Sequence, residues 1–148
     1  MTLLIRRLEV SDSTAWLELW NQYLVFYNQS LSNEQTQLTW NRLLADAGPI
    51  YARVAELDEK VVGFTHYSFT HSTWEHSPAV YVEDLFVSPS SRNSGVARAL
   101  AAELESIAVG AGSHRLHWIT QHHNVTARKL YDELGELTES IVYEKHLG

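Results

Sequence analysis

The stretch that most constrains the fold runs from Val80 to Ala108, where a strand pattern gives way within a few residues to a helix pattern. "VYVEDLFV" is typical of a buried strand, Pro89 follows it, and Gly95 opens a run with apolar residues at helical spacing. A helix that starts directly after a strand presents N–H groups and the positive end of its dipole, which suit an anion such as phosphate. The loop is neither a Walker loop nor a GxGxxG fingerprint. The alternative interpretation, a plain strand-to-helix turn whose Arg92 only adds solubility, is therefore not excluded by the loop alone.

The remaining patterns predict one α/β domain over residues 1–148, with a mixed central sheet flanked by helices. Ser32 with Gln35 fits a capping box at the start of the second helix, and Gly48-Pro49 stops it. Ser11 or Asp12 is the expected N-cap of the first helix. The predicted order is β-α-α-β-β-β-α-β-α-β, with strands over 3–10, 50–57, 61–71, 79–87, 115–120 and 138–147, and helices over 11–27, 31–46, 95–109 and 124–134.

Composition narrows the classes of function. The 148 residues include no cysteine, so disulfides and cysteine metal sites are excluded and a cytoplasmic location is the simplest expectation. The first apolar run is too short for a signal peptide, and no stretch approaches the roughly 20 apolar residues of a membrane span. The net charge of −7 argues against a nucleic-acid partner. The negative charge is compatible with a cationic substrate, but a need for solubility alone would explain it equally well.

Two motifs together resemble the GNAT superfamily of acyl-CoA-dependent N-acyltransferases, and the predicted order of elements matches that family's fold. The motifs are "RNSGVA" (92–97) and "NVTARKLYDELG" (124–135), with a predicted strand between them. "VYVEDLFV" with "HWITQHHNVTARKLY" is most similar to the branch that acetylates polyamines and small basic proteins. Asn93 and Ala97 stand where glycine is frequent in the family; alanine is an accepted variant, and asparagine tolerates a left-handed backbone.

The resemblance implies that acetyl-CoA is the co-substrate and that no metal takes part. It places the cofactor pyrophosphate on the loop and the start of the helix, and the pantetheine arm beside the preceding strand, paired like an extra strand. A backbone N–H near Val87 would face the thioester oxygen, and Asn124 would bind the pantetheine end. The implied cofactor-binding residues are Leu85, Phe86, Val87, Arg92, Asn93, Ser94, Gly95, Val96, Ala97, Arg98, Asn124 and Ala127, with Lys129 a further candidate for the phosphates.

The implied chemistry is direct attack of a neutral amine on the thioester, in a ternary complex. Tyr131 is the candidate proton donor to the departing thiolate, because a phenol, with a pKa of about 10, is ordinarily protonated at neutral pH. Glu83 is the candidate for removing the ammonium proton, and Asp84 for binding the substrate. Since neighbouring strand residues point to opposite faces, only one of these two carboxylates is expected to face the pocket. Tyr27 is the aromatic residue expected to stack on a cationic substrate.

The eight histidines lack metal-site spacing and are interpreted as structural or solvent-facing, with His66 or His71 a candidate substrate contact. Three functions remain open. The first is acetylation of a polyamine, small amine or basic peptide. The second keeps the fold but takes an amino acid, an aminoglycoside or a protein N-terminus. The third is a CoA-binding regulator without catalysis. The resemblance to this branch, whose members commonly dimerise, implies a homodimer. The last predicted strand could pair with that of a second copy at the sheet edge, although its pattern fits an ordinary half-buried strand as well.

Overall fold

The computed structural model describes residues 1–148 and divides into two compact units, Met1–Trp118 and Ile119–Gly148, each of which is described by itself. No helix is long and apolar enough to cross a membrane. The first unit contains β1 (Leu3–Arg7), η1 (Val10–Asp12), α1 (Ser13–Phe26), α2 (Asn33–Leu44), β2 (Tyr51–Leu57), β3 (Lys60–Thr70), β4 (Ala79–Val87), η2 (Pro89–Ser91), α3 (Val96–Gly110) and β5 (Leu116–Trp118). The second contains α4 (Val125–Leu134).

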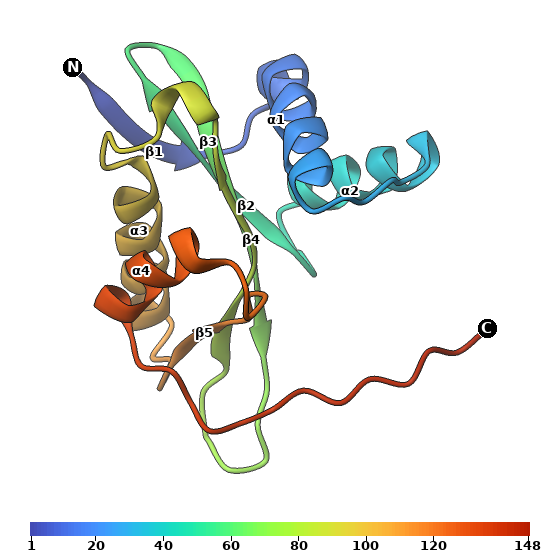
Figure 1. Cartoon of the computed structure of the whole chain (residues 1–148), viewed down its shortest axis with the longest axis vertical. Coiled ribbons are helices and arrows are strands. Elements are labelled where there is room, and N and C mark those ends of the chain that lie inside the picture. The colour runs from blue at the N-terminus through green and yellow to red at the C-terminus, as the bar shows by residue number, and fades with distance from the viewer. The chain divides into compact units, whose positions relative to one another are not determined.

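The first unit is one mixed sheet with the strand order β1-β2-β3-β4-β5. The first three pairings are antiparallel, and β5 returns parallel to β4 because α3 forms the crossover between them. Figure 1 shows α1 and α2 on one side of the sheet and α3 on the other. The α/β fold class, with its mixed sheet flanked by helices, is therefore confirmed.

Each face of this sheet buries its own apolar cluster. The face covered by α1 and α2, called the α1 face below, buries the side chains of Trp16, Trp20, Phe64 and Phe86. The opposite face is covered by the apolar stripe of α3, where Val96, Leu100, Leu104 and Ala108 recur at helical spacing and are buried. Strand residues alternate between these clusters, so the face of each β4 side chain is fixed by its neighbours.

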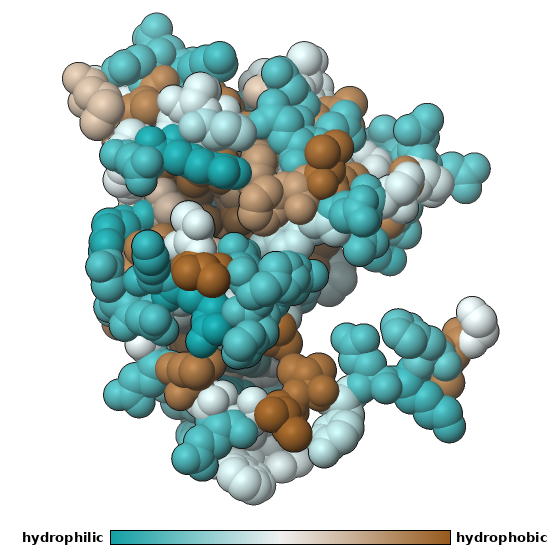
Figure 2. Space-filling view, viewed as in Figure 1, coloured by the Kyte–Doolittle hydropathy of each residue, from teal (hydrophilic) through white to brown (hydrophobic).

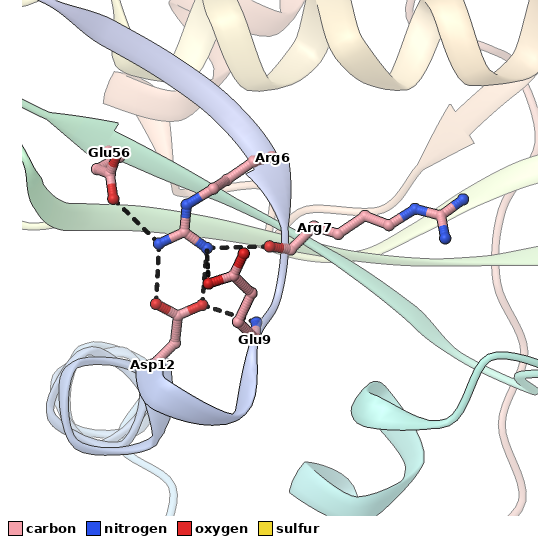
Figure 3. A network of polar contacts seen from close by, with 5 residues as sticks. All are labelled: Arg6, Arg7, Glu9, Asp12 and Glu56. Carbon is pink, nitrogen blue, oxygen red and sulfur yellow. Dashed lines mark hydrogen bonds and ion pairs between the residues drawn. The ribbon is translucent and has the colours of Figure 1, made fainter.

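A partly buried network of charged side chains links the start of α1 to the sheet (Figure 3). Arg6 donates to both carboxylate oxygens of Asp12 at 2.9 Å, and also to Glu56 Oε1 at 3.1 Å. The Glu9 N–H donates to Asp12 Oδ2 at 2.8 Å. Burial raises the pKa of Asp12, whereas the hydrogen bonds from Arg6 and Glu9 lower it. The lowering is larger, so the pKa of Asp12 lies below its usual value.

This network corrects the capping expected for the first helix. Asp12 occupies the N-cap position of α1, but its side chain makes no capping hydrogen bond to the helix, because Arg6 and the Glu9 N–H bind the carboxylate instead. The capping box predicted for the second helix forms only in part. The hydroxyl of Ser32 accepts from the N–H of Gln35 at 3.1 Å, but the Gln35 side chain donates to the Thr39 hydroxyl at 3.4 Å and does not return to the Ser32 N–H. That helix ends at Leu44, four residues before Gly48.

The strand predicted over residues 138–147 is wrong. Residues 136–148 form no helix or strand and pair with no other strand. An alternating apolar pattern does not make a strand by itself, because each backbone N–H and C=O of a strand needs a partner in a ladder. The apolar side chains of this segment are exposed; they are Leu137, Ile141, Val142, Tyr143 and Leu147. Figure 2 shows that brown, hydrophobic residues lie on the visible face of the molecule among mostly hydrophilic ones.

Candidate functional site

The C-terminal half of β4 has a strand neighbour on one side only. β5 pairs with β4 through Val80, Tyr81 and Val82, and then ends at Trp118. Beyond Val82, β4 continues to Val87 with β3 as its only partner. The second edge of this segment is therefore unpaired, and its outward backbone groups are placed to bind an extended ligand as a strand would.

The register decides which residues point to that edge. The Ser88 N–H donates to the Val62 carbonyl at 2.8 Å, so Phe86 and Asp84, which precede it at spacings of two on the same side of the bulge, also direct their backbone groups toward β3. Leu85 and Val87 consequently direct their N–H groups to the unpaired edge. Phe86 directs its backbone to β3 and buries its side chain in the core. Neither its backbone nor its side chain therefore faces the unpaired edge, where the cofactor is expected.

The loop after β4 contains left-handed backbone directly before α3. Asn93 and Gly95 both have positive φ, at 64° and 82°, and the hydroxyl of Ser94 donates to the carbonyl of Ser91. No side chain caps α3 at Gly95. A Cβ built at Gly95 would have no atom within 4 Å, so the space in front of this turn is open. Left-handed backbone ahead of an uncapped helix start is the arrangement that binds anions, so the loop fits a phosphate.

Arg92 holds this loop onto the end of β4. Its Nε donates to the Val87 carbonyl at 3.2 Å. Its guanidinium lies over the rings of Phe26 and Phe86, 5.7 and 5.6 Å from their centroids. The sequence predicts a phosphate contact for Arg92, and the structure shows that this side chain also ties the loop to α1 and the sheet.

A bulge in β4 brings Glu83 and Asp84 to the same face of the sheet, against the expectation that only one of them could face a given site. Asp84 pairs with His66 and Val82 with Tyr67, so Glu83 is the extra residue. Glu83 Oε1 accepts from the hydroxyl of Ser68 at 3.0 Å, and Asp84 Oδ2 lies 2.8 Å from His66 Nδ1. His66 and Ser68 are two residues apart on β3 and share the α1 face. The alternation argument fails here because a bulge breaks the period of two.

Tyrosines surround the two carboxylates. Tyr23 donates its hydroxyl to Asp84 Oδ1 at 2.6 Å, and the Tyr27 ring lies 4.9 Å from that of Tyr23. Burial and the charge of Asp84 raise the pKa of Tyr27. Burial, Glu83 and Asp84 raise that of Tyr81. Two carboxylates beside neutral aromatic rings form a surface that attracts and stacks on a cation.

Of the two histidines predicted as candidate substrate contacts, one is buried and one is exposed. His66 is 1% exposed, lies within the aromatic cluster and bonds to other side chains, so it cannot contact a substrate directly. His71 is exposed at the end of β3. No group of three or more His, Cys, Asp or Glu side chains could hold a metal ion.

The second unit carries the other motif on one helix face. Asn124 is the N-cap of α4, its amide donates to the Thr120 hydroxyl at 3.2 Å, and its carbonyl accepts from Arg128 N–H. Ala127 and Tyr131 follow at spacings of three and four, which places all three on the same face of the helix. The Gly135 N–H donates to the Tyr131 carbonyl and closes the helix, as predicted.

Sequence reasoning missed Tyr23 and the role of His66 beside Asp84. Tyr23 lies 61 residues from Asp84 in the chain and His66 lies 18 residues from it. The packing of α1 on the sheet brings Tyr23 to Asp84, and the pairing of β3 with β4 brings His66 to it. The available signal was the density of aromatic residues in α1, which also predicts an ordinary core.

Comparison with known proteins places this geometry among acetyltransferases. The profile of the acetyltransferase (GNAT) family matches residues 13–135, which spans both units. The D-amino-acid N-acetyltransferase HPA3 of Saccharomyces cerevisiae is 27% identical over 146 residues, 97% of this chain and 91% of that protein. The thialysine N-epsilon-acetyltransferase of Bos taurus is 33% identical over 82 residues, 54% of this chain and 48% of that protein.

A solved structure has the same fold over nearly all of this chain. The aminoglycoside N-acetyltransferase AAC(6')-Iy in complex with CoA superposes with a TM-score of 0.81 and 25% identity, over 98% of this chain and 95% of that one. The resemblance that the two sequence motifs indicated is therefore confirmed from both sequence and structure.

Proposed function

Because this chain belongs to the acetyltransferase (GNAT) family, we propose that it transfers the acetyl group of acetyl-CoA, its co-substrate, to a primary amine of a small cationic acceptor. The acceptor is a polyamine, a small amine or a basic peptide, and the reaction is direct attack in a ternary complex. One observation carries the choice of acceptor: the bulge in β4 sets Glu83 and Asp84 on one face, among tyrosines and next to the unpaired edge.

The proposed cofactor site uses backbone groups. The N–H groups from Asn93 to Arg98 bind the pyrophosphate, supported by the uncapped start of α3 and the open space at Gly95. Leu85 and Val87 pair with the pantetheine arm along the unpaired edge, and one of their N–H groups stabilises the negative charge that develops on the thioester oxygen. Asn124 and Ala127, on the same face of α4 as Tyr131, bind the pantetheine end.

The proposed acid–base chemistry uses Glu83, Asp84 and Tyr131. An alkyl ammonium has a pKa of about 10.4 and must lose a proton before it attacks. Glu83, which is exposed and bonded only through Ser68, accepts that proton directly or through water. Asp84 binds the ammonium, Tyr27 stacks beside it, and Tyr131 donates a proton to the departing thiolate.

The substrates in the names of the relatives decide which amines should be tested as acceptors. The yeast relative is named for D-amino acids, the bovine one for thialysine and the structural neighbour for aminoglycosides. The test is acetyl-CoA-dependent release of the CoA thiol with spermidine, spermine, lysine peptides, thialysine, D- and L-amino acids and aminoglycosides. We expect turnover with polyamines or basic peptides.

Three variants separate the proposed roles in that assay. Tyr131→Phe lowers kcat by roughly 100-fold, because a general acid contributes about that factor, and leaves the KM for acetyl-CoA unchanged. Glu83→Gln lowers kcat, whereas Asp84→Asn raises the KM for the amine. Turnover confined to neutral or anionic acceptors would contradict the proposed cationic acceptor, and full activity in Tyr131→Phe would remove Tyr131 as the acid.

We also propose that the protein is a homodimer in which residues 136–148 pair with a second copy. This segment exposes several apolar side chains and has no strand partner within its own chain. The cytoplasmic location stays a prediction from the sequence.

A further inference from the structure

A line of hydrogen-bonded side chains runs from the core to the carboxylate of Asp84. Trp16, on α1, donates its indole N–H to His66 Nε2 at 3.1 Å. His66 Nδ1 then lies 2.8 Å from Asp84 Oδ2. The other carboxylate oxygen accepts from the hydroxyl of Tyr23 at 2.6 Å. Both oxygens of Asp84 are therefore held by protein groups from two different elements.

The direction of these bonds fixes the state of the histidine. An indole N–H can only donate, so His66 Nε2 accepts and carries no proton. The neutral ring then has its proton on Nδ1, which donates to Asp84. The ring of Phe64 stacks on that of His66, with centroids 4.5 Å apart and planes 12° apart, so the imidazole plane is fixed as well.

The line has one buried end and one accessible end. The His66 side chain is 2% exposed, whereas that of Asp84 is 20% exposed. An ionised carboxylate offers about four acceptor positions, and the bonds from His66 and Tyr23 use two of them. The remaining positions are available to an acceptor ammonium on the α1 face. Because hydrogen bonds to protein groups already fix the conformation of this carboxylate, it loses little conformational entropy when it binds such a ligand.

We infer that Trp16 and His66 are positioning residues for the acceptor amine: they orient Asp84 so that its open acceptor positions meet the ammonium beside the unpaired edge of β4. The inference rests on the proposed function, since it needs Asp84 to bind the amine. Neither Trp16 nor His66 touches a substrate. Their effect is transmitted through the orientation of Asp84, so it falls on the amine and not on acetyl-CoA.

Two replacements of His66 separate its two hydrogen bonds. Asparagine carries its amide on Cγ, the atom that bears Nδ1 in histidine, so His66→Asn keeps a donor toward Asp84 and loses the acceptor for Trp16. Glutamine reaches the Nε2 position, so His66→Gln keeps the acceptor for Trp16 and loses the donor to Asp84. We expect kcat/KM for the amine to fall by roughly 100-fold in His66→Gln and by less than about 10-fold in His66→Asn, with the KM for acetyl-CoA unchanged in both.

A second pair of variants provides a control in the same aromatic layer. The Trp16 and Trp20 rings stack at 5.4 Å, and both side chains are buried, but Trp20 Nε1 donates no hydrogen bond to a protein atom. Trp16→Phe removes the donor to His66, and Trp20→Phe removes a similar ring volume without it. The nitrogen resonances of His66 report its tautomer. We expect an Nδ1–H ring in the wild-type protein and in Trp20→Phe, and a changed signal with a higher amine KM only in Trp16→Phe.

The outcomes are distinguishable. An active wild-type enzyme with equal amine kinetics in His66→Asn and His66→Gln, or a wild-type His66 protonated on Nε2, refutes the positioning inference alone. Equal effects of Trp16→Phe and Trp20→Phe on amine KM also refute it, since loss of packing would then explain both. A wild-type protein that acetylates no amine in the panel refutes the proposed function, and this inference with it.

Discussion

Gly95→Ala tests whether the loop before α3 binds the cofactor. The residue has φ of 82°, and a Cβ at this position would have no protein atom within 4 Å. The only cost to the folded protein is therefore the left-handed backbone, about 1–2 kcal/mol for a residue with a Cβ. For a chain of this size that lowers Tm by roughly 2–8 °C. A methyl group in the open space would, however, meet a pyrophosphate seated on the N–H groups of the loop.

Gly112→Ala is the matched control. Gly112 also has positive φ, at 70°, and its nearest neighbour is Ser77 Oγ at 3.5 Å, an ordinary contact distance. The two variants should lose similar stability. Only Gly95→Ala should weaken CoA binding, by at least about 10-fold, which corresponds to about 1.4 kcal/mol.

Titration calorimetry with CoA measures the Kd, and thermal unfolding followed by tryptophan fluorescence measures the Tm. Unchanged CoA affinity in a folded Gly95→Ala protein would refute the argument that the phosphate approaches this turn. Equal weakening in both glycine variants would show that backbone strain, and not contact with the ligand, is responsible.

Two further predictions concern stability and assembly. Asp12→Asn should lower the free energy of unfolding by about 3 kcal/mol at neutral pH, because it breaks a nearly buried ion pair with Arg6. Since the pKa of Asp12 is lowered on folding, the contribution of its carboxylate is present above the usual carboxyl range and is lost as pH falls through the lower, folded pKa. In urea denaturation, wild type and variant should therefore begin to converge only as pH falls below about 4, while the exposed Asp46→Asn should match wild type at neutral pH. Removal of residues 136–148 should convert a dimer to a monomer in gel filtration with light scattering, and a wild-type monomer would contradict the proposed dimer.

Local signals predicted most of the elements. β4 was predicted with its observed bounds, and α3 and α4 were predicted to within one residue, because apolar periodicity and glycine at helix ends act over a few residues. The same signals predicted a strand at 138–147 that does not form. A strand depends on a neighbour that its own sequence does not describe, whereas a helix bonds within itself.

The candidate site likewise combines features that have a local sequence signal with features that depend on residues distant in the chain. By itself, the sequence determined the loop "RNSGVA" and the motif on α4, since each lies within a dozen residues and reports a local backbone conformation. Only the tertiary structure decided that Glu83 and Asp84 share a face, because the bulge in β4 arises from the pairing with β3. It alone brought His66 to Asp84, through the pairing of β3 with β4, and Tyr23 to Asp84 and Trp16 to His66, through the packing of α1 on the sheet. These hydrogen bonds join residues 18 to 61 positions apart, so no local pattern describes them.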